Sequence, residues 1–177
     1  IKKNKINAIL IEPIEKNFND LKKNYQKFKF VKLENAAISV NNEINHLYKV
    51  DEKFLSFYDK HIPGITSFNK NHLLKHGVKK NHISSEKVNS ISITNIIRKY
   101  KLKKLDLLYI DTEGYDGKIV LDFLKIKSLK PIIIFEYIHI DSKVFAKVIE
   151  KLILSKYKFF SINENLICFP KNKFFSI

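Results

Sequence analysis

Two carboxylates at one predicted strand end are the residues best placed to do chemistry. Asp111 and Glu113 stand two residues apart, directly after the apolar run 105–110, and Gly114 follows them. Such acids could orient a nucleophilic hydroxyl, act as a general base or bind a divalent metal ion. A structural role also fits, with Asp111 or Thr112 as a helix cap and Glu113 as a first-turn acid. We expect Gly114 to take a positive φ in the bend.

A third acid, Glu12, closes the apolar run 6–11. In doubly wound folds the ligand binds outside the carboxyl ends of the strands, where an acid can accept hydrogen bonds from ribose hydroxyls. Glu12 could therefore hold an adenosyl or nicotinamide ligand. The alternative is a helix N-terminal acid, favoured by the dipole of the helix that we expect over 15–27.

Histidines occur after one predicted strand and within the weakly patterned segment 51–85. His139 follows the apolar run 131–137 and, with Glu136, could line an acceptor pocket, although packing or capping would also explain it. The segment 51–85 contains four more histidines, whose spacing matches no specific zinc site: His61, His72, His76 and His82. We expect these four to be solvated or packed in loops, with no metal centre.

The hydrophobic pattern predicts the elements that position these residues. Apolar residues three or four apart, or a capping residue before an apolar stretch, predict helices over 15–27, 69–76, 94–100, 116–124 and 142–155. Continuous or alternating apolar runs predict strands over 6–11, 28–33, 36–40, 44–50, 87–93, 105–110, 131–137, 157–162 and 166–169. We expect 36–40 and 44–50 to form a hairpin across Asn41 and Asn42.

These elements predict an α/β fold. Strands that are apolar on both faces and alternate with helices indicate a mostly parallel sheet that helices cover on both sides. The close pair 157–162 and 166–169 predicts an antiparallel hairpin at the C-terminal edge. We expect one domain over 1–177, with an inserted lid at 41–85 where the pattern weakens and Pro63-Gly64 interrupts it.

The composition narrows the class of protein. A chain of 177 residues with 45% hydrophobic content can bury a core, so we expect a folded chain and not a disordered one. No apolar run reaches the roughly 18 residues of a membrane span and no basic-then-apolar leader is present, so we expect a soluble, cytoplasmic protein. The single cysteine, Cys168, rules out a disulfide framework and is expected to be buried.

The net charge of +15 would suit a polyanionic partner, but its make-up argues against nucleic acid. Only one of the 33 basic residues is an arginine, Arg98, whereas recognition of phosphate and guanine favours the arginine fork. We therefore expect the lysines to be ordinary solvated surface residues and not a nucleic-acid-binding patch. An acidic or phosphorylated substrate, or an anionic membrane surface, stays open.

The stretch LDLLYIDTEGYDG, Leu105 to Gly117, resembles the signature of the FkbM-type methyltransferase family. Three further stretches resemble that family in the same order: ILIEP (9–13), NAAIS (35–39) and PIIIFEY (131–137). The stretch ITSFNKNHLLKHG (65–77) also resembles a segment of one subgroup of the family. Together they span about residues 6 to 169. The resemblance implies a Rossmann-like class I methyltransferase sheet and S-adenosylmethionine as the cofactor. The family's first strand and glycine-rich loop have no counterpart here. The chain begins at Ile1 and contains no methionine, so we expect a fragment or a trimmed product.

The resemblance also implies roles for individual residues. Glu12 would hold the ribose of the cofactor, and the turn Asn35, Ala36 and Ala37 would flank the adenine. Asp111 would face the methyl-transfer centre, with Glu113 beside it. Since an acceptor hydroxyl loses its proton in the transition state, our own hypothesis is that Asp111 acts as the general base. Contacts to the acceptor are expected from Glu136, His139, Ser67 and Asn71.

Three hypotheses follow for the function. The first is S-adenosylmethionine-dependent O-methylation of a small or carbohydrate-like acceptor, the carbohydrate being implied by the resemblance alone. The second is a non-catalytic binding or assembly module that keeps the fold, and the missing glycine-rich loop favours it. The third is a basic nucleic-acid-binding domain, whose binding would weaken steeply with salt.

Overall fold

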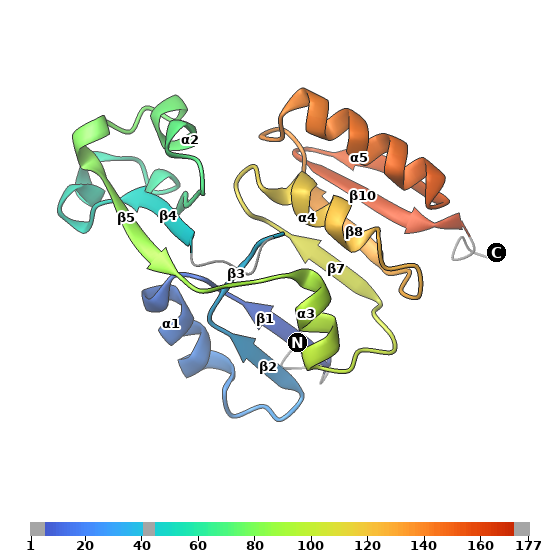
Figure 1. Cartoon of the computed structure of the whole chain (residues 1–177). Helices are drawn as coiled ribbons and strands as arrows, with labels where there is room; N and C mark the ends of the chain where they lie inside the picture. Colours follow the sequence, from blue (N-terminus) through green and yellow to red (C-terminus); the bar gives the residue numbers. More distant parts are fainter. Residues whose placement is uncertain (1–5, 41–44, 172–177) are drawn as a thin grey trace.

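The computed structural model of the chain describes residues 6–40 and 45–171 (Figure 1). Its α-helices are α1 (Glu15–Tyr25), α2 (Lys70–Lys75), α3 (Ile93–Lys99), α4 (Asp116–Phe123) and α5 (Ser142–Leu154). Its strands are β1 (Ala8–Ile11), β2 (Val31–Glu34), β3 (Ala37–Ile38), β4 (Asn45–Val50), β5 (Ile83–Val88), β6 (Ser90–Ile91), β7 (Leu107–Ile110), β8 (Ile132–Glu136), β9 (Tyr157–Ile162) and β10 (Asn165–Pro170). Short 3₁₀ turns occupy 52–57, 62–64 and 80–82. The expectation of a mixed α/β protein is confirmed.

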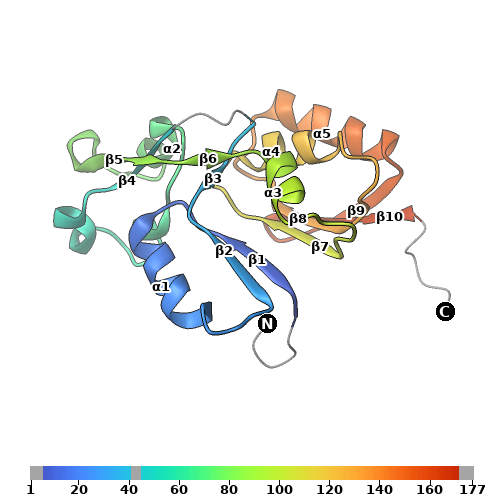
Figure 2. The same ribbon diagram turned by 60° about the horizontal axis from the view of Figure 1, so that its bottom comes forward.

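The largest sheet has the strand order β7-β8-β10-β9. β7 and β8 are parallel, whereas β8, β10 and β9 are antiparallel, so the predicted C-terminal edge hairpin is confirmed. Helices α4 and α5 cover one face of this sheet (Figure 2). The core between them contains fully buried side chains from both layers, among them Phe123, Ile133, Phe135, Leu152 and Cys168. The expected burial of Cys168 is thereby confirmed.

The opposite face of the same sheet exposes apolar side chains. Strand pairing sets Leu107 opposite Ile132 and Phe160 opposite Ile167, so alternate residues of adjacent strands share this face. Leu107 is 50% exposed and Tyr109 is 58% exposed. The prediction that helices cover the sheet on both sides is therefore wrong for this face, in the part of the chain that the structure describes.

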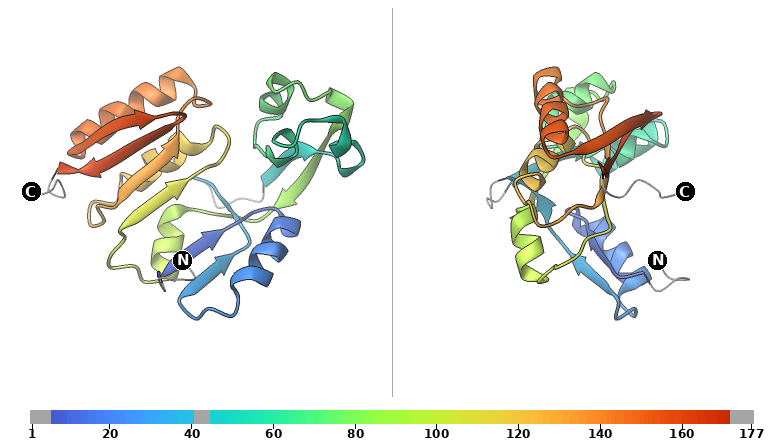
Figure 3. Two further views of the ribbon diagram at one scale, coloured as in Figure 1. Left: turned by 180° about the vertical axis from the view of Figure 1, so that it is seen from behind. Right: turned by 90° about the vertical axis from the view of Figure 1, so that its right-hand side faces the viewer.

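The N-terminal strands form separate small sheets. β1 and β2 are parallel, with α1 packed beside them, and β3 pairs in parallel with β6. Among the described strands, β1 has no ladder with β7, and the sheets stay distinct (Figure 3). The local βα units follow the prediction, but the strands of residues 6–40 and 45–171 do not form one continuous parallel sheet, so the predicted Rossmann-like sheet is not confirmed.

The segment 45–88 forms what we name the α2 lobe. β4 and β5 are antiparallel over their whole length, and α2 lies between them in the sequence. A small core supports the lobe: Val50, Ile62, Ile65, Leu73 and Val78. β4 pairs with β5 and not with 36–40, so the predicted hairpin is wrong. Residues 41–44, where the predicted lid begins and the turn was expected, lie outside the described residues.

None of the helices in 6–40 and 45–171 has the length and apolarity needed to span a membrane.

Candidate functional site

A buried carboxylate organises the turn that follows β7. Asp116 is completely buried and accepts hydrogen bonds from the Thr112 backbone N–H (3.3 Å), the Thr112 hydroxyl (2.9 Å) and the Gly114 N–H (3.2 Å). Burial raises the pKa of Asp116, and the hydrogen bond from Thr112 opposes that rise. Because these three donors lie on the turn itself, the role of Asp116 is to stabilise the turn and not to bind a ligand.

The turn contains two consecutive residues with positive φ. Gly114 has φ 95°, as the sequence predicted, and Glu113 has φ 50°. A left-handed conformation is strained for a glutamate, by about 1 kcal/mol, so packing must hold it in place. A Cβ at Gly114 would come within 3.0 Å of the His139 backbone oxygen. The glycine therefore allows the turn to approach the end of β8.

Asp111 lies exposed at the carboxyl end of β7. The helix-cap alternative for Asp111 and Thr112 is wrong, because the N-cap position of α4 is Tyr115. Glu113 likewise precedes the first turn of α4, where the acid is Asp116. Asp111 is thus available to a ligand at this edge.

The α2 lobe contacts the turn at three points. Glu113 Oε2 lies 3.0 Å from His72 Nε2, and the Ser67 hydroxyl donates to the Glu113 backbone oxygen at 3.0 Å. The rings of Phe68 and Tyr115 meet edge to face, with centroids 4.9 Å apart. Ser67 therefore does join the predicted site, although through the backbone of Glu113.

Three histidines gather around Glu113. His72 and His76 come from one face of α2 and its C-cap, and His139 follows β8. Their ring centroids are 4.6 to 5.1 Å apart. Of the two expected alternatives, solvated or packed in a loop, solvation is wrong for His72, which is only 8% exposed and lies in α2. Burial lowers the pKa of both His72 and His139, which favours the neutral imidazoles.

Glu136 lies next to this group at the end of β8. Its Oε1 is 3.8 Å from His139 Nε2, and its Oε2 is buried without a hydrogen-bond partner among the described residues. Burial first, and then the charges of Glu113, Asp116 and Asp111, raise the pKa of Glu136 to about 7. The pKa of Glu113 is raised by burial and by Asp111.

We call this group the acid–histidine site: Asp111, Glu113, Glu136, His72, His76 and His139. The site combines four residues that the sequence analysis proposed as functional with His72 and His76, which were expected to be solvated or packed in loops. Asn71, expected to contact the acceptor, is exposed in the first turn of α2. Its N–H donates to the side chain of Asn69. His82 is separate, because its ring stacks on Phe54.

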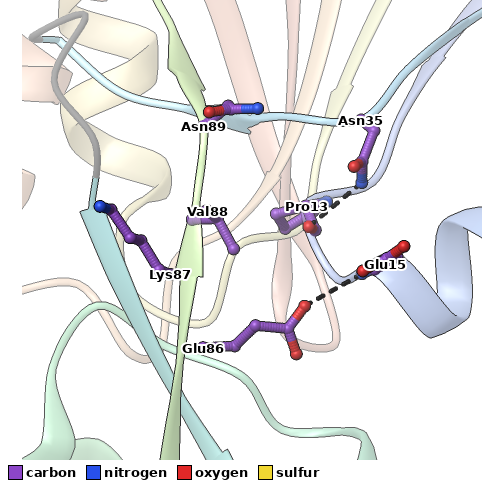
Figure 4. Close-up of a pocket in the computed structure, with 7 residues that line it drawn as sticks. All are labelled: Pro13, Glu15, Asn35, Glu86, Lys87, Val88 and Asn89. Carbon is purple, nitrogen blue, oxygen red and sulfur yellow. Dashed lines mark hydrogen bonds between the residues drawn. The ribbon is translucent and has the colours of Figure 1, made fainter.

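A second site lies beyond the carboxyl ends of β1 and β2. A pocket of about 460 Å³, here called the β1–β2 pocket, is lined by Pro13, Glu15, Asn35, Glu86, Lys87, Val88 and Asn89 (Figure 4). The Asn35 side chain donates to the backbone oxygens of Glu12 (3.0 Å) and Pro13 (3.2 Å), which holds the β1 and β2 ends together. The amide of Asn35 also lines the pocket.

The predicted cofactor residues are divided between this pocket and the core. Glu12 adjoins the pocket, and its Oε1 accepts from the Ile14 N–H at 2.8 Å, just before α1. Burial raises the pKa of Glu12, and the bond from Ile14 opposes this. Ala36 and Ala37 are buried, at 6% and 4% exposure, so their side chains are packed instead of lining the pocket.

Glu86 is the acid of this pocket that sequence reasoning missed. It accepts from the Glu15 N–H at 3.2 Å and pairs with Lys49 (Figure 4 shows the bond to Glu15). Burial would raise its pKa, but the hydrogen bonds from Lys49 and Glu15 together lower it. The alternating strand signal at 87–93 began too late to place Glu86 on β5, so nothing drew attention to it.

Comparison with known families shows what kind of protein carries these two sites. The model of the FkbM methyltransferase domain matches residues 2–160. The chain therefore belongs to the FkbM methyltransferase family. The curated proteins and the solved structures gave no match.

Proposed function

We propose that the chain transfers a methyl group from S-adenosylmethionine to a hydroxyl of a small or carbohydrate-like acceptor. Membership of the family supports methyl transfer as the reaction class. The observation that carries the proposal is the exposed carboxylate of Asp111 at the end of β7, on a turn that buried Asp116 holds rigid. A reacting group on a fixed turn suits a reaction that depends on positioning.

The β1–β2 pocket supports the cofactor assignment. Its volume of about 460 Å³ lies within the usual range for small-molecule sites. The carboxylates of Glu12 and Glu86 could accept from the ribose hydroxyls of an adenosyl group, and Asn35 could contact the base. Glu12 Oε1 accepts from the Ile14 N–H, and the carboxylate keeps further acceptor sites for a ligand hydroxyl.

Bound S-adenosylmethionine would supply an electrophilic methyl group. The chain's own task is then to hold the acceptor hydroxyl and take its proton. We assign the proton to Asp111, because Glu113 is engaged with His72. Glu136 and His139, at the end of the neighbouring strand, would contact the acceptor.

The test of the base uses a tritium-labelled methyl donor and a panel of mono- and oligosaccharides. Asp111→Asn should lower turnover by about 10²- to 10⁴-fold, the usual contribution of a general base, while cofactor affinity stays within about twofold. The matched control is Asp106→Asn, five positions earlier, whose side chain is 71% exposed. Normal turnover by Asp111→Asn would remove Asp111 from the mechanism.

The test of the cofactor site is calorimetry with S-adenosylmethionine on the 177-residue chain. Glu12→Ala should weaken binding by about 1 to 3 kcal/mol, the range for lost hydrogen bonds to a charged group. Asp20→Ala, an exposed acid on α1, should not change it. No binding by the wild-type chain would contradict the proposal. Binding without turnover on any acceptor would favour the non-catalytic module.

A further inference from the structure

Four metal-binding side chains of the acid–histidine site converge on one point. Each of His72, His76, Glu113 and His139 can present one ligand atom, and these four atoms all lie within 4.8 Å of one another. From this geometry we propose that the four residues bind a zinc ion. The proposal concerns metal binding itself and stands whether or not the chain transfers methyl groups.

The distances suit a zinc centre after small side-chain movements. Zinc bound to nitrogen and oxygen at 2.0–2.2 Å in a tetrahedron sets its ligand atoms about 3.3 Å apart. His72 Nε2 and Glu113 Oε2 are already 3.0 Å apart. The remaining ligand atoms need to move inward by an ångström or so, which rotation about the side-chain bonds can supply.

The scaffold supplies the ligands from three places. His72 and His76 are four residues apart, so they project from the same face of α2 and its C-cap, and the helical bond from the His76 N–H to the His72 oxygen keeps that spacing. Glu113 is held by its left-handed backbone and by Ser67. His139 is fixed where its backbone packs against Gly114.

The ligand chemistry selects the type of ion. Magnesium and calcium prefer sets of oxygen ligands, whereas three imidazoles with one carboxylate suit zinc and its transition-metal neighbours. The local charge favours any cation, because Asp111 and Glu164, which lies in the turn between β9 and β10, add negative charge around Glu113. Glu164 also acts on His139. The carboxylate of Glu136 lies 3.8 Å from His139 Nε2, which is too long for a hydrogen bond, and it places a further acidic group beside that imidazole.

Bound zinc would link the α2 lobe to the turns that follow β7 and β8. In the described residues the ligands come from both sides of this contact, where Ser67 and Phe68 also touch the turn. The ion would thereby fix the lobe over the carboxyl ends of β7 and β8. It would occupy His139, so acceptor contacts in the zinc-bound protein would come from Asp111 and Glu136. These two acids are not among the four ligands, and Asp111 stays exposed at the same edge.

The experiment is a calorimetric titration of the full chain, stripped with EDTA, with zinc chloride alone. We expect one saturable equivalent of zinc. His76→Gln and His139→Gln should each weaken binding by at least about 100-fold, more than loss of an outer hydrogen-bond partner usually costs. The matched control is His61→Gln, an exposed histidine of the same lobe, which should bind as the wild type does.

Cobalt(II) provides a second readout that reports geometry. Cobalt in the tetrahedral site should give intense visible absorption, which Glu113→Gln and His139→Gln should reduce or abolish. Circular dichroism of each metal-free variant tests whether it is folded. His76 is only half-buried, so His76→Gln is the ligand variant that we expect to perturb the fold least. No saturable zinc binding by the wild type would overturn the proposal. The proposal would also be overturned if the His76 and His139 variants bound zinc as tightly as the wild type. The same holds if His61→Gln weakened zinc binding as much as they do.

Discussion

The acid–histidine site and the β1–β2 pocket both lie beyond the carboxyl ends of parallel strands, but different bonds hold them in shape. In the first, a fully buried carboxylate, Asp116, gathers three donors of one turn. In the second, the partly exposed pair of Glu86 and Lys49 and the Asn35 amide span separate segments. One site is prearranged by buried side chains, and the other can rearrange around a ligand.

The difference has a direct physical origin. A buried hydrogen-bonded carboxylate cannot exchange its partners for water, so the turn 111–116 has one low-energy arrangement. A pair that is about a quarter exposed, as Lys49 and Glu86 are, can separate at low cost because water solvates both charges. This difference is consistent with the proposal that the end at β7 positions the acceptor and the end at β1 admits the cofactor.

The strongest challenge to this comparison is Asp116→Asn. The amide keeps the shape but turns an N–H₂ group toward N–H donors, so we expect the free energy of unfolding to fall by about 3 kcal/mol. Urea denaturation with EDTA present measures it without any contribution from metal. Asp106→Asn, which changes an exposed acid, should cost less than about 0.5 kcal/mol. Equal costs would show that Asp116 does not organise the turn.

Gly114→Ala tests the same turn through its backbone. A methyl group at φ 95° is strained and would lie 3.0 Å from the His139 oxygen, so we expect a loss of about 2 kcal/mol in unfolding free energy. Gly64→Ala is the control, since a Cβ there meets nothing within 4 Å. If both variants unfold at the same urea concentration, the close approach of the turn to β8 is not needed.

Prediction from the sequence worked best where periodicity and burial agree. The apolar run before Asp111, the helix from Asp116 and the C-terminal hairpin were all placed correctly, because strongly periodic segments carry their own signal. The positive φ of Gly114 was also predicted correctly, because a glycine in the bend between a strand and a helix can adopt it without strain. These features are local in the chain.

Prediction failed where distant segments decide the outcome. β4 has the alternation of a strand, but its pairing with β5 instead of 36–40 depends on 32 intervening residues that fold as a lobe. His72 and His76 were judged by spacing alone, whereas their meaning depends on His139, which is 63 positions beyond His76 in the chain. Asp116 was taken only as the start of a helix, although its burial makes it the centre of the turn.

The smallest expected effect concerns pH, and it distinguishes the two sites by sign. The raised pKa of Asp116 means that its contribution to stability is full below about pH 3.8, the ordinary value, and is lost as pH rises through the folded pKa. The lowered pKa of Glu86 means the reverse, with stability present above about pH 4.5 and lost as pH falls. The contributions of Asp116 and Glu86 to the free energy of unfolding should therefore change with pH in opposite directions.

Glu86→Gln tests the pH dependence of the Glu86 contribution to stability. We expect the variant to lose less than about 1 kcal/mol of unfolding free energy at pH 7, because water screens the partly exposed pair with Lys49. That difference from the wild type should shrink as the pH of the urea titration is lowered below 4.5. The difference between wild type and Asp116→Asn should instead grow in the acid range. Parallel slopes would mean that both carboxylates are held alike, and the distinction between a rigid turn and an adaptable pocket would fail.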